Sequence, residues 1–340
     1  MTQLNRNCSL DIFRYVCALL VVAIHIHPFM DINRSIGYFS TQVIPRIAVP
    51  FFFAVSGYFF IKNLYANNSV YKIFKKIFIV YAVWSLVYFF ISFSGLITND
   101  ITLTTIFKKY PARFFITGSF YHLWFFPALF FAMISVFVSY KLKLMKILFI
   151  FSVIFYFIGC LGCSWYFFGN KILFISYIVN LPYFNLIRRI LFMGLPFFMI
   201  GYVLIFLKNK YRDISNKKLI HVLIIFVICF FAEIFFVLEF NLKRDIILTF
   251  FLYPLLISIM LLLINTPLLD KQNIAYRYRV MANFTYYVHP IIIILLSKFF
   301  NLTNLNVKET VTYFIVCFIT TTLGFIIVKM DNQYINKIVV

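Results

Sequence analysis

Charged residues are scarce in this sequence, and acidic residues are the scarcest of them. They make up 12% of its 340 residues, whereas an average soluble domain has about 25%. Hydrophobic residues make up 64% of the chain and aromatic residues 22%. So few charges cannot cover a water-facing surface, which excludes a soluble enzyme, and so many apolar residues exclude a disordered chain. We therefore expect an integral membrane protein.

Glycine, proline and cysteine are also infrequent. The 10 glycines and 10 prolines exclude a collagen-like chain. The six cysteines are scattered, mostly in apolar runs, unlike the disulfide framework of a small secreted domain. Cys160 and Cys163 form a CxxC pair without a second pair or a nearby histidine, so we expect free thiols and no metal site. No small-residue cleavage site follows the first apolar run, so we expect no cleaved signal peptide.

The abundant apolar residues gather into segments long enough to cross a membrane, which takes about 20 mostly apolar residues. These segments are 10–29, 43–62, 73–97, 122–140, 146–163, 189–207, 219–240, 246–264, 282–300 and 310–329. We predict an all-α, polytopic membrane protein of about ten transmembrane helices in one bundle, with residues 1–340 as a single domain. The stretch 171–180 is too short to span and is predicted to be re-entrant or interfacial.

The charge balance is strongly positive, with 31 Lys and Arg against 10 Asp and Glu. In a membrane protein this excess indicates orientation by the positive-inside rule and contact with anionic lipid, and we expect no nucleic-acid partner. Basic residues are more frequent in the segments that are internal when the N-terminus is cytoplasmic. We therefore expect both termini to be cytoplasmic, in the bacterial inner or plasma membrane. The outer segments are basic too, which suits either an anionic substrate or lipid headgroups.

The first predicted span contains the densest set of ionisable residues: Asp11, Arg14, His25 and His27. Charges inside a bilayer are costly, so such residues are candidates for function. Arg14 and His25 are eleven residues apart, which places them on one helix face about 16 Å apart along the axis. Asp11 shares that face and can neutralise Arg14, whereas His27 points elsewhere, at the outer boundary. Taken singly, these residues are better explained as an ordinary ion pair at the cytoplasmic edge and a hydrogen-bonded core histidine than as functional groups.

Other polar residues occur where the bilayer makes them costly. Glu233 lies in the middle of the seventh predicted span and should face the protein interior. His122 and Trp124 open the fourth span, where Trp124 is also typical of an aromatic belt. His289 lies within the ninth span, where its two alternative roles, packing in the protein interior and lining a cavity, are equally compatible with the sequence. The small pair at Ser56 and Gly57 favours close helix contact over catalysis, because no GxSxG elbow is present.

Several segments resemble the acyltransferase family 3 membrane proteins, which include bacterial O-acetyltransferases of surface glycans. Arg14 and His25 match the family's R-x10-H pattern, and residues 52–58 look like its FF-x-x-SG-Y segment. His122–Phe125 resembles its HLWF segment, and Tyr287–Pro290 resembles its late YxxHP segment. The resemblance covers the whole chain.

Lysines stand at one position of the pattern where many family members have arginines. Lys75 and Lys76 occupy the basic pair that opens the third span, and a lysine ammonium lacks the guanidinium fork that grips a phosphate. The membrane domain of the vancomycin-resistance serine racemases is similar in further segments, which here are Arg46–Pro50, His122–Leu129 and Arg188–Gly201. We find no counterpart of their racemase domain in these residues, so the resemblance does not imply racemisation.

The family resemblance implies transfer of an acyl group, acetyl in the simplest case, from cytoplasmic acyl-coenzyme A to a hydroxyl of a surface or lipid-linked glycan. It implies that His25 is the general base or a transient acyl carrier. Arg14, Lys75 and Lys76 would bind the phosphates of the donor, acetyl-CoA or another acyl-CoA. His122, Trp124, Glu233 and His289 are weaker candidates for substrate binding, and no metal cofactor is expected.

A second function is compatible with the same resemblance. The link to serine racemase membrane domains indicates a transporter or flippase for an amino acid such as serine, or for a glycan precursor. Transporters commonly have repeated halves, and we find no internal repeat. A purely structural role is disfavoured, because several buried ionisable groups cost stability.

Overall fold

The computed structural model describes residues 7–96, 110–210, 214–266 and 272–330. Within these ranges the regular structure is entirely helical, with no strand, as the sequence predicts. The α-helices are α1 (Cys8–Ile26), α2 (Arg34–Tyr38), α3 (Ala48–Tyr65), α4 (Tyr71–Leu96), α6 (Phe125–Lys141), α7 (Met145–Gly162), α8 (Tyr166–Gly169), α9 (Leu173–Val179), α10 (Phe184–Ile187), α11 (Leu195–Lys210), α12 (Asn216–Glu239), α13 (Leu252–Asn265), α14 (Gln272–Leu302) and α15 (Glu309–Met330). Four tighter or wider helical turns are η1 (Phe39–Val43), η2 (Ile44–Ile47), η3 (Arg113–Thr117) and η4 (Arg188–Gly194).

Each of the ten predicted spans corresponds to a helix. Within the described ranges, eight helical segments are long and apolar enough to cross a membrane: Cys8–Ile26, Arg34–Tyr65, Tyr71–Ser92, Met145–Gly162, Phe184–Leu207, Asn216–Glu239, Ile274–Leu302 and Glu309–Met330. The other two, α6 and α13, are apolar but shorter. Residue 97, the last of the third predicted span, and both chain termini lie outside the described ranges. The short helix α9 occupies the stretch that is too short to span.

The described chain divides into two compact units. The first contains residues up to Phe52, the helix α12 and the residues from Thr249 onward, and the second contains Phe53–Lys210 and Phe240–Leu248. The helix α3 begins in the first unit and continues into the second. The sequence predicted one domain for residues 1–340, whereas the contacts within the chain group into these two units.

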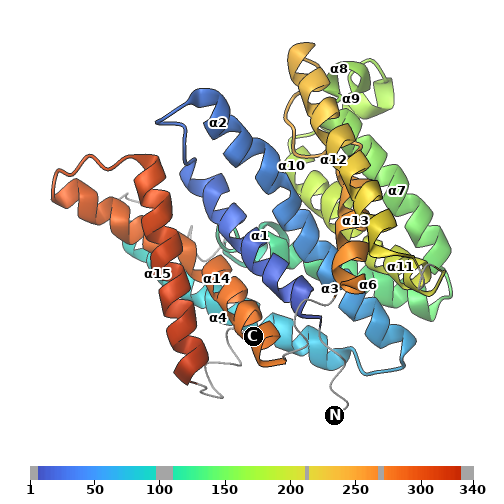
Figure 1. Ribbon diagram of the computed structural model, residues 1–340, viewed down its shortest axis with the longest axis horizontal. Helices are drawn as coiled ribbons and strands as arrows, with labels where there is room; N and C mark the ends of the chain where they lie inside the picture. Colours follow the sequence, from blue (N-terminus) through green and yellow to red (C-terminus); the bar gives the residue numbers. More distant parts are fainter. Residues whose placement is uncertain (1–6, 97–109, 211–213, 267–271, 331–340) are drawn as a thin grey trace. The chain divides into compact units, whose positions relative to one another are not determined.

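The first unit is organised around α1, which packs against α13, α14 and α15 (Figure 1). Asn7 caps α1 and its side-chain Nδ2 also donates to the carbonyl oxygen of Leu263 at 2.7 Å. The hydroxyl of Ser9 donates to the carbonyl of Thr266 at 2.6 Å. Farther along α1, the Tyr15 hydroxyl bonds the hydroxyl of Thr321 at 2.5 Å. Residues from opposite ends of the chain therefore hold α1 in place.

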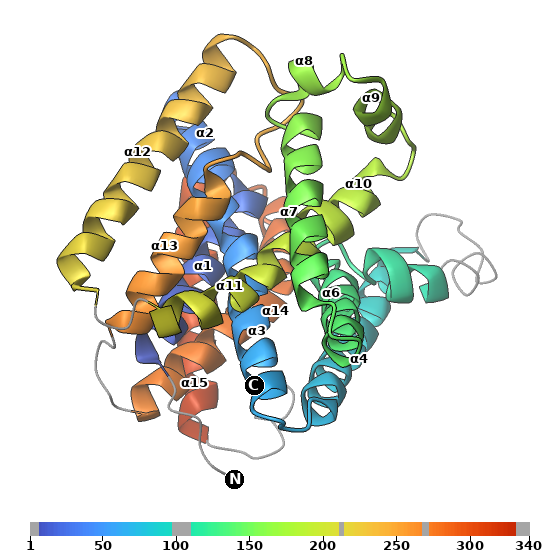
Figure 2. The ribbon, with the colours of Figure 1, turned by 90° about the vertical axis from the view of Figure 1, so that its right-hand side faces the viewer.

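The second unit depends on a close crossing of α3 and α11. A Cβ added to Gly57 would overlap the carbonyl oxygen of Phe198, and one added to Gly201 would overlap the backbone of Gly57. Only glycine permits two helix backbones to approach so closely. The predicted close contact at the Ser56–Gly57 pair is thereby confirmed. Nearby, α6, α7 and α11 pack against one another (Figure 2).

An ion pair between an arginine and a carboxylate joins η4 to the segment that follows α12 in the second unit. Arg188 pairs with Asp245, and the guanidinium groups of Arg188 and Arg244 both lie over the Phe184 ring, at 5.8 and 5.1 Å from its centre. The backbone amide of Arg244 donates to the carbonyl of Cys163 at 2.9 Å.

We expect Gly57→Ala to lower the free energy of unfolding by about 1–3 kcal/mol, because the new methyl group forces the α3 and α11 backbones apart. Thermal unfolding of the purified protein in detergent measures the change. Gly324→Ala is the matched control, since a Cβ there meets Met281 at 3.4 Å, an ordinary contact. Equal melting temperatures for the two variants would contradict the role assigned to the Gly57 crossing.

Candidate functional site

The ion pair predicted on α1 is present. Arg14 Nη1 lies 2.8 Å from Asp11 Oδ1, and the two side chains are 16% and 6% exposed. Because the residues are three apart, one turn of helix brings them together. The neutralisation of Arg14 by Asp11 is therefore confirmed. The ion pair allows the guanidinium to lie partly buried.

His25, near the other end of α1, lies against His289 of α14. The two imidazole rings stack with centroids 5.3 Å apart and an angle of 22° between their planes. His25 is partly buried and His289 is completely buried. Residues 264 positions apart in the sequence thus meet face to face. His27 ends the helix in a left-handed conformation and is exposed, in agreement with its predicted boundary position.

The orientation of the His289 ring is set by its own helix. Its Nδ1 lies 3.0 Å from the carbonyl oxygen of Thr285. A carbonyl oxygen can only accept, so Nδ1 carries the proton and the neutral ring presents its lone pair at Nε2. Pro290 follows inside α14 and has no N–H, so it donates no hydrogen bond along the helix. The irregularity lies directly beside the histidine pair.

Glu233 is buried, as its position in the middle of a span predicts, and it caps a helix. Its two carboxylate oxygens accept hydrogen bonds from the backbone N–H groups of Phe250 and Phe251, at 2.7 and 2.8 Å. These amides immediately precede α13, whose N-terminus favours a negative charge. The capping role accounts for a buried carboxylate without a nearby basic residue in the sequence. Binding of substrate by Glu233 stays a prediction.

His122 and Trp124 lie in the second unit. His122 is 3% exposed and makes edge-to-face contact with Tyr88, with ring centres 4.8 Å apart. The partly buried Trp124 packs beside Phe53, with ring centres 6.3 Å apart. The HLWF segment therefore contributes to an aromatic cluster with residues of the FF-x-x-SG-Y segment.

Arg189 is a candidate that sequence reasoning did not single out. Its guanidinium lies 5.0 Å from the centre of the Trp124 ring. Unlike Arg188, it forms no ion pair with a described residue. It also lies in the π-helical turn η4, a type of irregularity frequent at functional sites. The adjacent pair of arginines in the sequence was the available signal, but only the fold distinguishes which of them pairs with Asp245.

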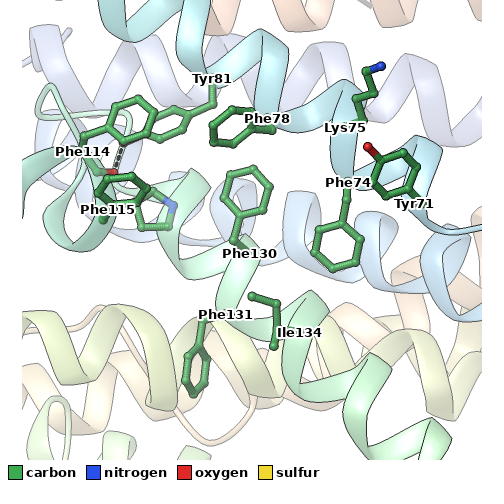
Figure 3. Close-up of a pocket in the computed structure, with 11 residues that line it drawn as sticks. Tyr71, Phe74, Lys75, Phe78, Tyr81, Phe114, Phe115, Phe130, Phe131 and Ile134 are labelled. Carbon is green, nitrogen blue, oxygen red and sulfur yellow. Dashed lines mark hydrogen bonds between the residues drawn. The ribbon is translucent and has the colours of Figure 1, made fainter. Parts of the chain in front are cut away.

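Lys75 and Lys76 lie on α4 and both are exposed. Lys75 lines a cavity of about 590 Å³ between α4, η3 and α6 (Figure 3). Lys76 does not line it, because successive residues of a helix point about 100° apart. The two predicted phosphate-binding lysines therefore face different surroundings. Among the described residues, no group of three or more His, Cys, Asp or Glu is placed to hold a metal ion.

Residues 7–329 match the family described as the acyltransferase domain. This chain belongs to that family. The match includes the histidine pair and every predicted site residue, and the long apolar helices make the chain a multi-pass membrane member of this family.

Similar proteins include two from Enterococcus faecalis, both named amino-acid racemase. One is 30% identical over 305 residues, covering 86% of this chain and 42% of that protein. The other is 30% identical over 235 residues, covering 68% of this chain and 32% of that protein. A serine/alanine racemase of Enterococcus gallinarum is 34% identical over 131 residues, covering 36% of this chain and 18% of that protein. The chain thus spans less than half the length of these relatives. No solved structure matches it.

We expect Glu233→Ala to reduce the free energy of unfolding by about 1–3 kcal/mol, because two part-buried amides lose their acceptor. Glu239→Ala is the control, since Glu239 is exposed on the same helix and its loss should change stability by less than about 0.5 kcal/mol. Thermal unfolding in detergent compares the two variants. If both melt at the wild-type temperature, the carboxylate does not stabilise the start of α13.

Proposed function

We propose that this protein is an O-acyltransferase, in which His25 acts as general base on an acceptor hydroxyl. The observation that carries the proposal is the stacked pair of His25 and His289, with Arg14 on the same helix. His25 removes the hydroxyl proton as the oxygen attacks the thioester carbonyl of the donor. An ester C–O bond forms, the thioester C–S bond breaks, and the proton passes from His25 to the leaving thiolate.

The positive charge of Arg14 supports an acyl-coenzyme A donor, which carries phosphates. Arg14 lies about 16 Å along α1 from His25, a separation that suits a donor with its phosphates at one end and its thioester at the other. Its guanidinium can provide charge-assisted hydrogen bonds to phosphate. The donor would be acetyl-CoA or another acyl-CoA from the cytoplasm, with Arg14 at the cytoplasmic end of α1 and both chain termini in the cytoplasm.

The acceptor proposed is a hydroxyl of a cell-surface or lipid-linked glycan. His122 and Trp124 are the candidates for the acceptor that the family resemblance implies. The membrane is the bacterial inner or plasma membrane. Mass spectrometry of surface glycans with and without the gene identifies the acceptor, and an unchanged acylation pattern would contradict a glycan.

His25→Ala should reduce acyl transfer at least about 100-fold, the typical contribution of a general base. Arg14→Lys should raise the KM for the acyl-CoA donor several-fold and leave more of kcat, because lysine cannot make a bidentate contact with phosphate. Transfer is measured with the purified protein in lipid nanodiscs, and correct insertion is checked by expression and melting temperature. Wild-type transfer by His25→Ala would refute the mechanism.

His289 is proposed to position His25. His289→Asn retains a side-chain N–H at the place of Nδ1, where it can still donate to the Thr285 carbonyl, but removes the stacked ring. We expect kcat to fall, the KM for the donor to stay within about twofold, and the pH profile of kcat to shift, because the surroundings of His25 change. A uniform loss of folded protein with an unchanged pH profile would show a structural role alone.

Transport of an amino acid such as serine, or of a glycan precursor, is the second candidate function. The observation in its favour is the similarity to proteins named amino-acid and serine/alanine racemases. Proteoliposomes containing the purified protein distinguish the two functions. Uptake of labelled serine without consumption of acyl-CoA would favour transport, whereas consumption of acyl-CoA without uptake would favour transfer.

A further inference from the structure

The cavity between α4, η3 and α6 is polar only at one end. Along α4 its wall runs from Tyr71 and Lys75 to Tyr81, and along α6 from Ile134 to Pro127 (Figure 3). Lys75 and Tyr71 lie at one end of this wall, and Tyr81 and Phe114 lie at the other. The remaining lining side chains are apolar: Phe74, Phe78, Phe115, Pro127, Phe130, Phe131 and Ile134.

Stacked aromatic rings close the end away from Lys75. The Tyr81 ring lies 4.6 Å from Phe114 and 5.0 Å from Phe126, measured between ring centres. The Tyr81 hydroxyl donates to the carbonyl oxygen of Phe114 at 2.5 Å, so it is already hydrogen-bonded within the protein. This end therefore offers a ligand little but apolar contact.

The long wall of the cavity is exposed, and in a spanning helix an exposed apolar wall is expected to face lipid. Side chains there are exposed by large fractions, including 47% for Phe78, 53% for Ile134 and 71% for Phe115. Ten residues separate Tyr71 from Tyr81, about 15 Å of helix, which equals half of a hydrocarbon core about 30 Å thick. The cavity thus has the depth of one lipid leaflet, and a lipid can enter it sideways.

Lys75 lies at the level where headgroups are expected. It is in the second turn of the Tyr71–Ser92 span, close enough to the end for its ammonium to reach the membrane interface. It is exposed and forms no ion pair with a residue that the structure describes. One cation at the mouth of one elongated apolar volume complements an anion that carries one long hydrocarbon chain.

We propose that this cavity binds a single-chain lipid phosphate, with the chain along the α4–α6 wall and the phosphate on Lys75. Phosphate is favoured over a neutral headgroup because of the ammonium, and a single chain is favoured because the closed aromatic end leaves room for one. The site goes beyond the proposed acyl transfer, since binding requires no chemistry at His25.

Photolabelling of the full-length protein in phosphatidylcholine nanodiscs tests the site. The probe is dodecyl phosphate with a diazirine in its chain, and peptide mass spectrometry maps the label. We expect label on the α4 segment 74–81 and the α6 segment 127–134. Excess dodecyl phosphate should compete, whereas dodecanol and dodecyltrimethylammonium should not.

Charge-matched variants identify the anion contact. Lys75→Gln should weaken labelling about fivefold, the contribution of one lysine near an anionic headgroup. Lys72→Gln is the control, because Lys72 is exposed on the same helix and does not line the cavity. Ile134→Trp should block labelling by filling the cavity from an exposed position that folding tolerates. Melting temperatures verify that each variant is folded.

Three results would overturn the proposal: equal labelling of Lys75→Gln and Lys72→Gln, equal competition by dodecanol, or equal competition by a diacyl phosphatidylglycerol. Failure of the proposed function is distinguished by His25→Ala, which should lose acyl transfer and retain labelling. Transfer in a wild-type protein that takes up no label at the cavity would overturn the lipid site and leave the enzyme assignment standing.

Discussion

The packing of α1 against α14 is the interaction on which the first unit depends. Hydrocarbon offers no hydrogen-bond partners, so polar groups in a spanning helix must find them in other helices. Polar side chains at the start of α1 find such partners at the end of α13 and in α15. The same packing brings His25 against His289, so the stability of this unit and its candidate chemistry arise from one contact.

The second unit achieves close packing by other means. Glycines let α3 and α11 cross with their backbones in contact, and stacked aromatic rings fill the space around α4 and α6. Three of its cations have different surroundings: Arg188 is neutralised by Asp245, Arg189 lies over Trp124, and Lys75 lines the cavity beside α4. The family match at residues 7–329 extends over both units.

Much of the fold follows from composition and periodicity, because a membrane requires apolar helices: every predicted span corresponds to a helix, and eight are long enough to cross. Local pairs were equally predictable: Asp11 and Arg14 are one turn apart, and helix geometry alone brings them together. Glu233 shows where such reasoning stops. Its position predicted burial, but its partners are backbone amides at the start of the next helix, which no residue pattern marks.

By itself, the sequence determined that this is a helical membrane protein, that Arg14 and His25 share a helix face, and that it resembles the acyltransferases. These properties depend on hydrophobicity and on the fixed turn of a helix, both of which are local. Only the tertiary structure decided that His289 is the partner of His25, that Arg188 rather than Arg189 pairs with Asp245, and that Lys75 rather than Lys76 borders a cavity. Each of these depends on which helices pack together, a choice made by side-chain fit between segments far apart in the chain.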